Sequence, residues 1–184
     1  MTRHLSRDEL DAGLAEIRRS PKDNGVLKGI VIRPEEDARQ SLASAEVSPE
    51  GGVHGDRWAR TCWKTLPDGR PHPDVQICIM NARAIALVAQ VEDRWALAGD
   101  NLFLDMDLSA ENLPPGQRLA LGSALLEITD EPHNACGKFA ARYGTDAAKF
   151  VNSAAGKQLH LRGIYARVIE PGTIAVGDTA TKRE

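Results

Sequence analysis

Residues 118–129, Arg118-Leu119-Ala120-Leu121-Gly122-Ser123-Ala124-Leu125-Leu126-Glu127-Ile128-Thr129, decide the fold of this chain. Two short apolar runs flank Gly122-Ser123, and a glycine-led pair between such runs is typical of the two-residue turn of a β-hairpin. Similar short runs recur at 26–33, 42–47, 75–80, 102–104, 162–170, 173–176 and 178–181. Many short strands with a few small helices predict an α+β domain that is mostly β, built as a closed or partly closed β-barrel.

Four segments are expected to be helical. Ser6-Arg7-Asp8-Glu9 has the form of a capping box and apolar residues follow at helical spacing, so residues 7–19 predict an amphipathic helix packed on the domain or on a partner. Short helices are expected at 82–92, 135–143 and 146–154. Residues 58–74 have little periodicity and several prolines, which predicts a long loop. We therefore expect a helical lead-in over residues 1–25 and one barrel domain over residues 26–184.

The charge and hydropathy patterns argue against two classes of partner. The formal net charge is −3 and no run of lysine or arginine stands out, whereas general nucleic-acid binding needs a clustered basic footprint. No apolar stretch approaches the roughly 20 residues of a membrane span. Residues 1–9 also lack the apolar core of a signal peptide. We expect a cytoplasmic protein that binds neither nucleic acid nor membrane.

The cysteines and histidines give little support for a structural zinc site. Cys62, Cys78 and Cys136 are widely spaced and form no CxxC pair. Cys78 lies in the apolar run 75–80 and is expected in the core, and Cys62 lies in a polar loop with no assigned role. The histidines that could join them are also far apart in sequence; they are His54, His72 and His133.

Cys136 has a sequence context that would activate its thiol. Asn134 is a good N-cap and Gly144 a natural helix stop, so Cys136 is expected in the first turn of a short helix. The partial positive charge there favours the thiolate. Lys138 and Arg142 are four residues apart and share a helix face, so they could hold an anion beside the sulfur. This arrangement indicates sulfur or soft-metal chemistry on an anionic ligand.

Several segments together resemble the MOSC domain, named for the C-terminal domain of molybdenum-cofactor sulfurases. The matching segments, in order, are Gly52–Arg57, Gly99–Leu102, Pro115–Gly122, Leu125–Thr129, Pro132–Cys136, Arg162–Val168 and Gly172–Asp178. They span about residues 26–182 and look most like the small stand-alone members. The resemblance implies a strand-rich barrel that binds the molybdenum cofactor (molybdopterin), with chemistry independent of pyridoxal phosphate. It also implies that Cys136 is catalytic, as a sulfur carrier or as a ligand of molybdenum in the cofactor.

A pocket for this cofactor needs cations for its phosphate and amide groups for its pterin. The cofactor-binding candidates are Arg57, Asn101, Lys138, Arg142 and Arg162. Each has a structural alternative. Arg57 could pair with Asp56 or another acid. Asn101 could act only in forming its turn, and Arg162 could extend along the surface. Lys138 and Arg142 could be solvated helix charges, and His133 could help to deprotonate Cys136 if the turn brings them together.

The sequence leaves three functions open. The first is a sulfur carrier or reductase component that acts through Cys136, either by sulfur transfer or by reduction of an N-hydroxylated small molecule. It would need a sulfur donor or an electron-transfer protein as partner, because the chain has no flavin or nicotinamide fingerprint. The second is a non-catalytic interaction module that uses the 58–74 loop and the N-terminal helix. The third is a structural zinc protein, and a homodimer is compatible with each.

Overall fold

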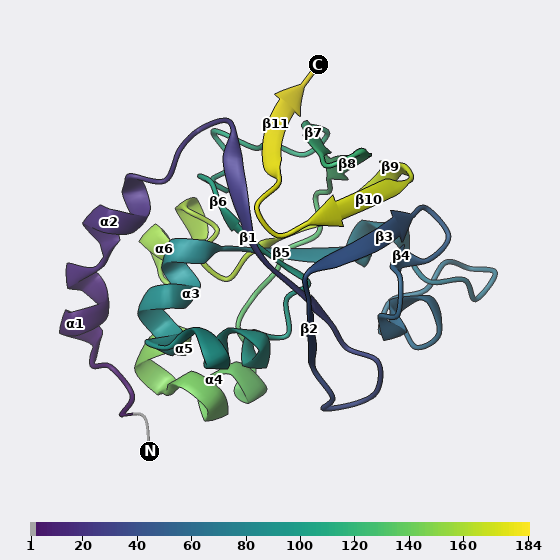
Figure 1. Cartoon of the computed structure of the whole chain (residues 1–184). Helices are drawn as coiled ribbons and strands as arrows, with labels where there is room; N and C mark the ends of the chain where they lie inside the picture. The colour runs from purple at the N-terminus through teal and green to yellow at the C-terminus, as the bar shows by residue number, and fades with distance from the viewer. Residues whose placement is uncertain (1–2) are drawn as a thin grey trace.

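The computed structural model describes residues 3–184 and places seven strands in a closed, mixed β-barrel (Figure 1). The barrel strands are β1 (Gly25–Ile32), β5 (Ile77–Asn81), β6 (Leu102–Asp105), β7 (Arg118–Leu121), β8 (Ala124–Ile128), β9 (Ile164–Glu170) and β11 (Thr179–Arg183). Their order is β11-β7-β8-β9-β5-β6-β1, and β1 closes the barrel by pairing with β11. β2 (Gln40–Leu42) extends the sheet beyond β1, while β3 (Ser44–Ser48), β4 (Gly52–Val53) and β10 (Gly172–Ala175) form a second sheet. The predicted barrel is confirmed.

The hairpin expected over residues 118–129 is present as β7 and β8. Leu121 pairs with Ala124, so Gly122 and Ser123 form the two-residue turn. Gly122 has a φ of +56°, and a Cβ at this position would lie 2.2 Å from the carbonyl oxygen of Thr173. Glycine is therefore required here both by the backbone conformation and by the approach of β10.

The only parallel pair described for the barrel is β5 with β6, and a helical crossover connects them. The crossover consists of α3 (Ala82–Ala89) and the 3₁₀-helix η3 (Glu92–Ala98). Asn81 begins α3, because its side chain accepts a hydrogen bond from the N–H of Ala84 at 2.9 Å. Every residue of β5 is buried, since one face of the strand lines the barrel and the other lies under the helices.

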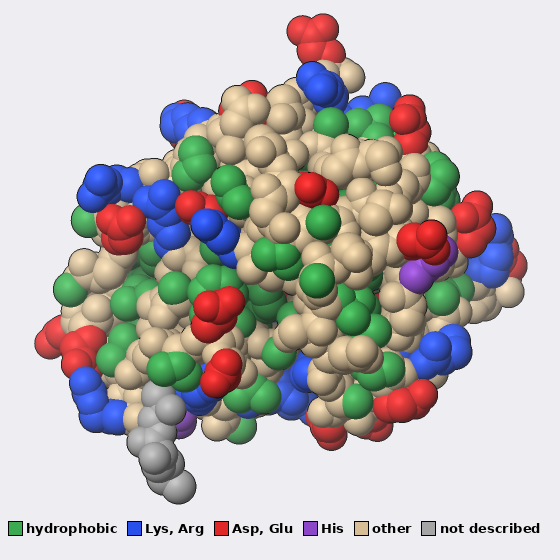
Figure 2. All heavy atoms as spheres, in the orientation of Figure 1, with side chains coloured by type: hydrophobic (Ala, Val, Ile, Leu, Met, Phe, Trp, Pro, Cys, Tyr) green, Lys and Arg blue, Asp and Glu red, His purple; other side chains and the backbone are tan. Residues whose placement is uncertain are grey.

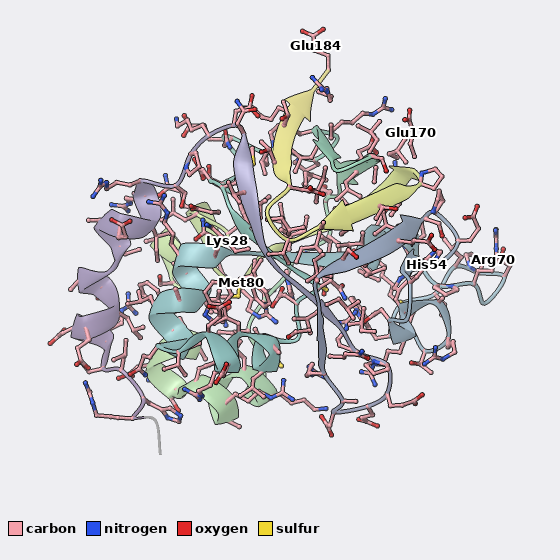
Figure 3. The ribbon with its side chains drawn as sticks, viewed as in Figure 1. Lys28, His54, Arg70, Met80, Glu170 and Glu184 are labelled. Atoms are coloured by element: carbon pink, nitrogen blue, oxygen red, sulfur yellow. The ribbon has the colours of Figure 1, made fainter. Side chains whose placement is uncertain are left out.

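The remaining helices gather on one side of the barrel (Figure 1). They are α1 (Arg7–Ala12), α2 (Leu14–Arg18), α4 (Gly137–Tyr143), α5 (Thr145–Val151) and α6 (Ala154–Gln158). Their apolar faces form a second core, in which Leu10 and Ile17 are buried together with Met80 beneath α3 (Figure 3). The capping box of Ser6 and Glu9 is confirmed.

Several helix predictions differ from the structure in detail. The helix expected over 82–92 ends at Ala89, where Gln90 adopts a left-handed φ of +66°. The helix expected over 7–19 is divided at Gly13, where a Cβ would lie 2.4 Å from Leu87 and the chain therefore passes close to α3. The helix expected over 146–154 ends at Val151, and α6 follows as a separate element. Ser153 starts it by accepting a hydrogen bond from the N–H of Gly156 at 3.1 Å.

The 58–74 segment is largely irregular, as expected, with the short 3₁₀-helices η1 (Arg57–Ala59) and η2 (Pro73–Val75) at its ends. Arg70 marks its projecting tip in Figure 3. On the face shown in Figure 2, acidic and basic side chains are interspersed. Among residues 3–184, no helix is both long enough and apolar enough to cross a membrane.

Candidate functional site around Cys136

Cys136 lies immediately before α4 and is exposed to solvent. The expected N-cap at Asn134 is wrong, because α4 begins at Gly137 with Cys136 as its N-cap. The physical reason is Asn152, whose amide accepts from the N–H of Ala135 at 3.0 Å and donates to the carbonyl of Ala135 at 3.2 Å. These bonds hold the chain extended there, so the helix starts later than expected. Gly144 ends α4 at a φ of +99°, as predicted.

The thiols of Cys136 and Cys78 have opposite electrostatic environments. Partial burial opposes ionisation of Cys136, but the backbone N–H groups of Phe139 and Lys138, together with the charge of Arg162, outweigh it and lower its pKa. Burial raises the pKa of Cys78 to about 11, as expected for a core cysteine. Cys136 is therefore the thiol prepared for thiolate chemistry.

Arg162 lies buried beneath the first turn of α4. Its guanidinium carbon is 5.0 Å from the centre of the Phe139 ring. Nη1 donates to Oδ2 of Asp100 at 2.6 Å and Nη2 donates to the carbonyl of Ala98 at 3.1 Å. Within the described chain, Nε has no hydrogen-bond partner. Arg162 therefore faces inward toward a buried carboxylate and does not extend along the surface.

Asn101, Asp56 and Arg33 form a hydrogen-bonded network that links the ends of several strands. Asp56 makes a two-point ion pair with Arg33, at 2.8 Å and 3.0 Å, and also accepts from the amide of Asn101 at 3.2 Å. Asn101 is fully buried, accepts from the N–H of Cys78 at 3.1 Å and donates to the carbonyl of Val31 at 3.2 Å. Its amide is thus engaged with protein groups, and its position is structural.

Arg39 lies near three other arginines, one of them Arg33 of this network, and the group concentrates positive charge. Burial lowers the pKa of Arg39, and the neighbouring charges of Arg142, Arg33 and Arg57 lower it further. Nε of Arg39 is buried without a partner in the part of the chain described. Asp56 forms its ion pair with Arg33, and over residues 3–184 Arg57 has no acidic partner. Binding of an anion would reduce the repulsion among these like charges.

Lys138 and Arg142 do share one face of α4, but an acidic loop lies against them. Lys138 is 3.7 Å from Glu36 and 3.6 Å from Asp37, and Arg142 is 3.6 Å from Asp37. Arg142 also donates to the carbonyl of Leu97 at 2.7 Å. The loop between β1 and β2 therefore partly neutralises the two cations beside the thiol.

The histidines lie apart from one another. His133 stacks on Tyr165 with ring centres 4.5 Å apart, and its Nδ1 is 3.8 Å from Oδ1 of Asp100. His54 contacts Ser48, and His72 caps η2. Residues 3–184 contain no group of three or more histidine, cysteine and acidic side chains that could hold a metal ion.

Comparison with known proteins gives the context for this arrangement. A sequence model of the MOSC domain matches residues 67–181, more than half of the chain. The chain belongs to the MOSC domain family. A search of curated proteins gives no match.

Solved structures share the fold of this MOSC protein at low sequence identity. YuaD from Bacillus subtilis is 17% identical with a TM-score of 0.64, and the alignment covers 86% of this chain and 95% of YuaD. YiiM from Escherichia coli is 17% identical with a TM-score of 0.54, covering 86% and 70% of the two chains. YiiM from Geobacillus stearothermophilus is 18% identical with a TM-score of 0.53, covering 89% and 75%.

Sequence reasoning missed three residues that shape the MOSC site. Arg33 and Arg39 follow β1 and were not distinguished from other surface arginines, because only the fold brings them to α4. Asp100 follows Gly99 in the motif segment Gly99–Leu102, and it is fully buried against Arg162. Its place in that segment was the one available signal, and that signal does not reveal its partner.

Proposed function

We propose that this MOSC protein binds the molybdenum cofactor on the surface around Cys136, with the thiolate as sulfur carrier or ligand. The observation that carries the proposal is an exposed thiol with a lowered pKa beside arginines whose charges are not fully paired. Perturbed ionisable groups that gather around a reactive thiol are typical of functional sites. Family membership supports the choice of cofactor, since the MOSC domain is associated with it.

The residues present fit the chemistry of the cofactor. Arg57 and Arg39 would bind its phosphate, because Nε of Arg39 lacks a partner within residues 3–184 and Arg57 lacks an acid there. Arg162 would stabilise the negative charge of the thiolate. Asn101 would position Arg33 and the strand ends through its hydrogen bonds and would make no contact itself.

Lys138 and Arg142 would join the site in exchange for Glu36 and Asp37. An anion that carries more charge than a single carboxylate competes well for a lysine and an arginine, since exposed ion pairs are individually weak. The acidic loop would then move away from α4. Lys138 and Arg142 would pair with Glu36 and Asp37 in the empty site and with the anion in the occupied site.

The bound cofactor would supply a molybdenum centre for which sulfur is a suitable ligand. As a sulfur carrier, the Cys136 thiolate would attack the outer sulfur of a donor persulfide. A new S–S bond then forms on Cys136, and the donor leaves as its thiolate, so atoms and electrons balance. As part of a reductase, the protein would need electrons from a partner.

The test is retention of molybdenum and pterin after incubation of the purified protein with isolated cofactor, followed by gel filtration. We expect retention by the wild type, loss on Cys136→Ser, and no change on Cys62→Ser, the matched thiol control. Arg57→Gln should reduce retention while circular dichroism stays unchanged. Equal retention by the Cys136→Ser and wild-type proteins would rule out the thiolate as the anchor.

The interaction module remains the second candidate because of one exposed residue. The indole of Trp63 in the 58–74 loop is 69% exposed, which is unusual for so large an apolar side chain. Retention of cofactor by neither wild type nor variant would favour this module, or sulfur carriage that needs no resident molybdenum. Loss of a co-purifying partner on Trp63→Ser would then support the module.

A further inference from the structure

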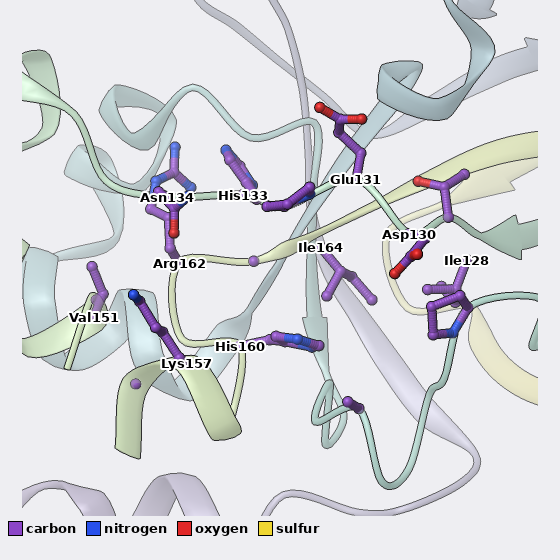
Figure 4. Close-up of a pocket in the computed structure, with 16 residues that line it drawn as sticks. Ile128, Asp130, Glu131, His133, Asn134, Val151, Lys157, His160, Arg162 and Ile164 are labelled. Atoms are coloured by element: carbon purple, nitrogen blue, oxygen red, sulfur yellow. The ribbon is translucent and has the colours of Figure 1, made fainter. Parts of the chain in front are cut away.

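The chain segment that leads to Cys136 also lines a cavity. Its volume is about 390 Å³, within the range of small-molecule sites, and Cys136 is not among the residues that line it. The wall includes residues 130–134, residues 162–164 at the start of β9, and the region of α6. Ile128, Val151 and Ile164 form an apolar lining (Figure 4).

Polar groups stand around this apolar lining. His133 and His160 lie on opposite sides of the cavity in Figure 4. Nδ1 of His160 is 2.8 Å from the carbonyl of Leu108, so it must donate. Nδ1 of His133 lies 3.8 Å from Oδ1 of Asp100, and both atoms, like Nε of Arg162, are buried without hydrogen-bond partners in the described chain. Because buried polar groups are nearly always hydrogen-bonded, these three atoms call for a water or a ligand at the inner end of the cavity wall.

The charges around the cavity divide into compensated and uncompensated ones. Arg162 is compensated by Asp100, and Glu131 pairs with Lys64. Over residues 3–184, Lys157 and Asp130 have no ion-pair partner. They are exposed and stand on opposite sides of the cavity in Figure 4. The cavity thus has one free positive and one free negative charge, separated by an apolar lining.

We propose that this cavity binds a small zwitterion, with its acidic group toward Lys157, its amino or amidinium group toward Asp130, and an apolar spacer between them. A neutral ligand would pair with neither of these exposed charges, and a simple anion or cation would pair with only one. The cavity shares Arg162 with the surface around Cys136, but Lys157 and Asp130 are not among the cofactor-binding residues, so the proposal does not depend on the proposed function.

Titration of the full chain, without cofactor, with matched probes tests this site. The zwitterionic probes are γ-aminobutyrate and ε-aminocaproate, and the probes with one charge are hexanoate and hexylamine. Binding is followed by NMR of the His133 and His160 rings. We expect one zwitterion to bind about threefold to fivefold more tightly than either singly charged probe, as for the gain of one exposed ion pair.

Two variants should remove that advantage selectively. Asp130→Asn should reduce the affinity for the zwitterion to that for hexanoate, and Lys157→Gln should reduce it to that for hexylamine. Lys149→Gln and Glu170→Gln, which change exposed charges elsewhere, serve as controls. Equal affinity for all probes, unperturbed histidine rings, or variants that behave as the controls do would overturn the proposal. The test uses no molybdenum, so failure of cofactor binding cannot cause any of these results.

Discussion

The three cysteines of this MOSC protein show how position decides the chemistry of one residue type. Cys78 lies within β5, where burial raises its pKa to about 11 and keeps the thiol protonated. Cys62 packs at the edge of a small cluster around Trp58. Cys136 stands in solvent at the start of α4 with backbone N–H groups and Arg162 near its sulfur. The amino-acid composition alone would not distinguish these three thiols.

His133 makes the stability of the protein depend on pH. Burial, with the charges of Arg162 and Arg33, lowers the pKa of His133 well below its usual range in the folded state. The unfolded chain therefore takes up the proton first as pH falls through about 6.5. The free energy of unfolding should decrease by up to about 1.4 kcal/mol per pH unit below that point.

Urea unfolding between pH 5 and 7, in about half-unit steps, measures this slope. His133→Gln should flatten it, whereas His54→Gln, a change at an exposed ring, should leave it as in the wild type. A slope that is the same in all three proteins would contradict the assignment to His133.

At the scale of elements, the loop between β1 and β2 controls the potential at α4. Glu36 and Asp37 lie close to Lys138 and Arg142, so the double variant Glu36→Gln/Asp37→Asn exposes two cations beside Cys136. The rate of Cys136 with the anionic Ellman reagent should increase severalfold relative to its rate with neutral iodoacetamide. Added salt should reduce this difference, because exposed charges are screened within about 10 Å at 0.1 M.

The matched control removes two exposed acids elsewhere, as Glu46→Gln/Glu50→Gln. If the control and the loop variant change the ratio of rates equally, only net charge matters. The loop then has no specific effect on the thiol.

The turn between β7 and β8 gives an element-scale test of packing. Gly122 and Gly116 both have positive φ, at +56° and +88°, so alanine costs about 1–2 kcal/mol at either from backbone strain. Only at Gly122 would the new Cβ also meet the Thr173 carbonyl, at 2.2 Å, while nothing lies within 4 Å at Gly116. Chemical unfolding should show a clearly larger loss for Gly122→Ala than for Gly116→Ala, and equal losses would argue against close contact with β10.

At the scale of the whole molecule, two cores share the same strands. Successive residues of β5 and β6 face opposite sides, so Ile79 and Leu102 line the barrel while Met80 and Phe103 lie under the helices. Disorder in one core therefore disturbs the other. We expect a single unfolding transition in which tryptophan fluorescence and helical circular dichroism coincide.

A substitution at Leu10 tests whether α1 and α2 unfold in the same cooperative transition. Its side chain is fully buried in the helical core, so Leu10→Ala should lower the free energy of unfolding by about 2–4 kcal/mol. The exposed Leu97 is the control, and Leu97→Ala should change it by less than about 0.5 kcal/mol. A loss at Leu10 as small as that at Leu97 would mean that α1 contributes little to the fold.

The elements that could be predicted from the sequence are those set by local chemistry. The Gly122-Ser123 turn and the Ser6 capping box formed where expected, since neighbouring residues determine them. The strand expected over 75–80 is present as β5 but starts at Ile77, because Val75 belongs to η2. The start of α4 was wrong because Asn152, far along the chain, holds Ala135 extended. Arg57 and Arg142 were among the sequence candidates, but Arg33, Arg39 and the buried Asp100 could not be anticipated, because residues distant in sequence meet only in the closed barrel.

The closure of the barrel has a consequence for biosynthesis. β1 pairs with β11 at Gly25–Ala180 and Val26–Thr179, so this partner is synthesised long after β1 itself. At about 5–20 residues per second, β1 waits on the order of ten seconds or more with an unpaired edge. A nascent chain in this state is a natural client for chaperones that bind exposed strands.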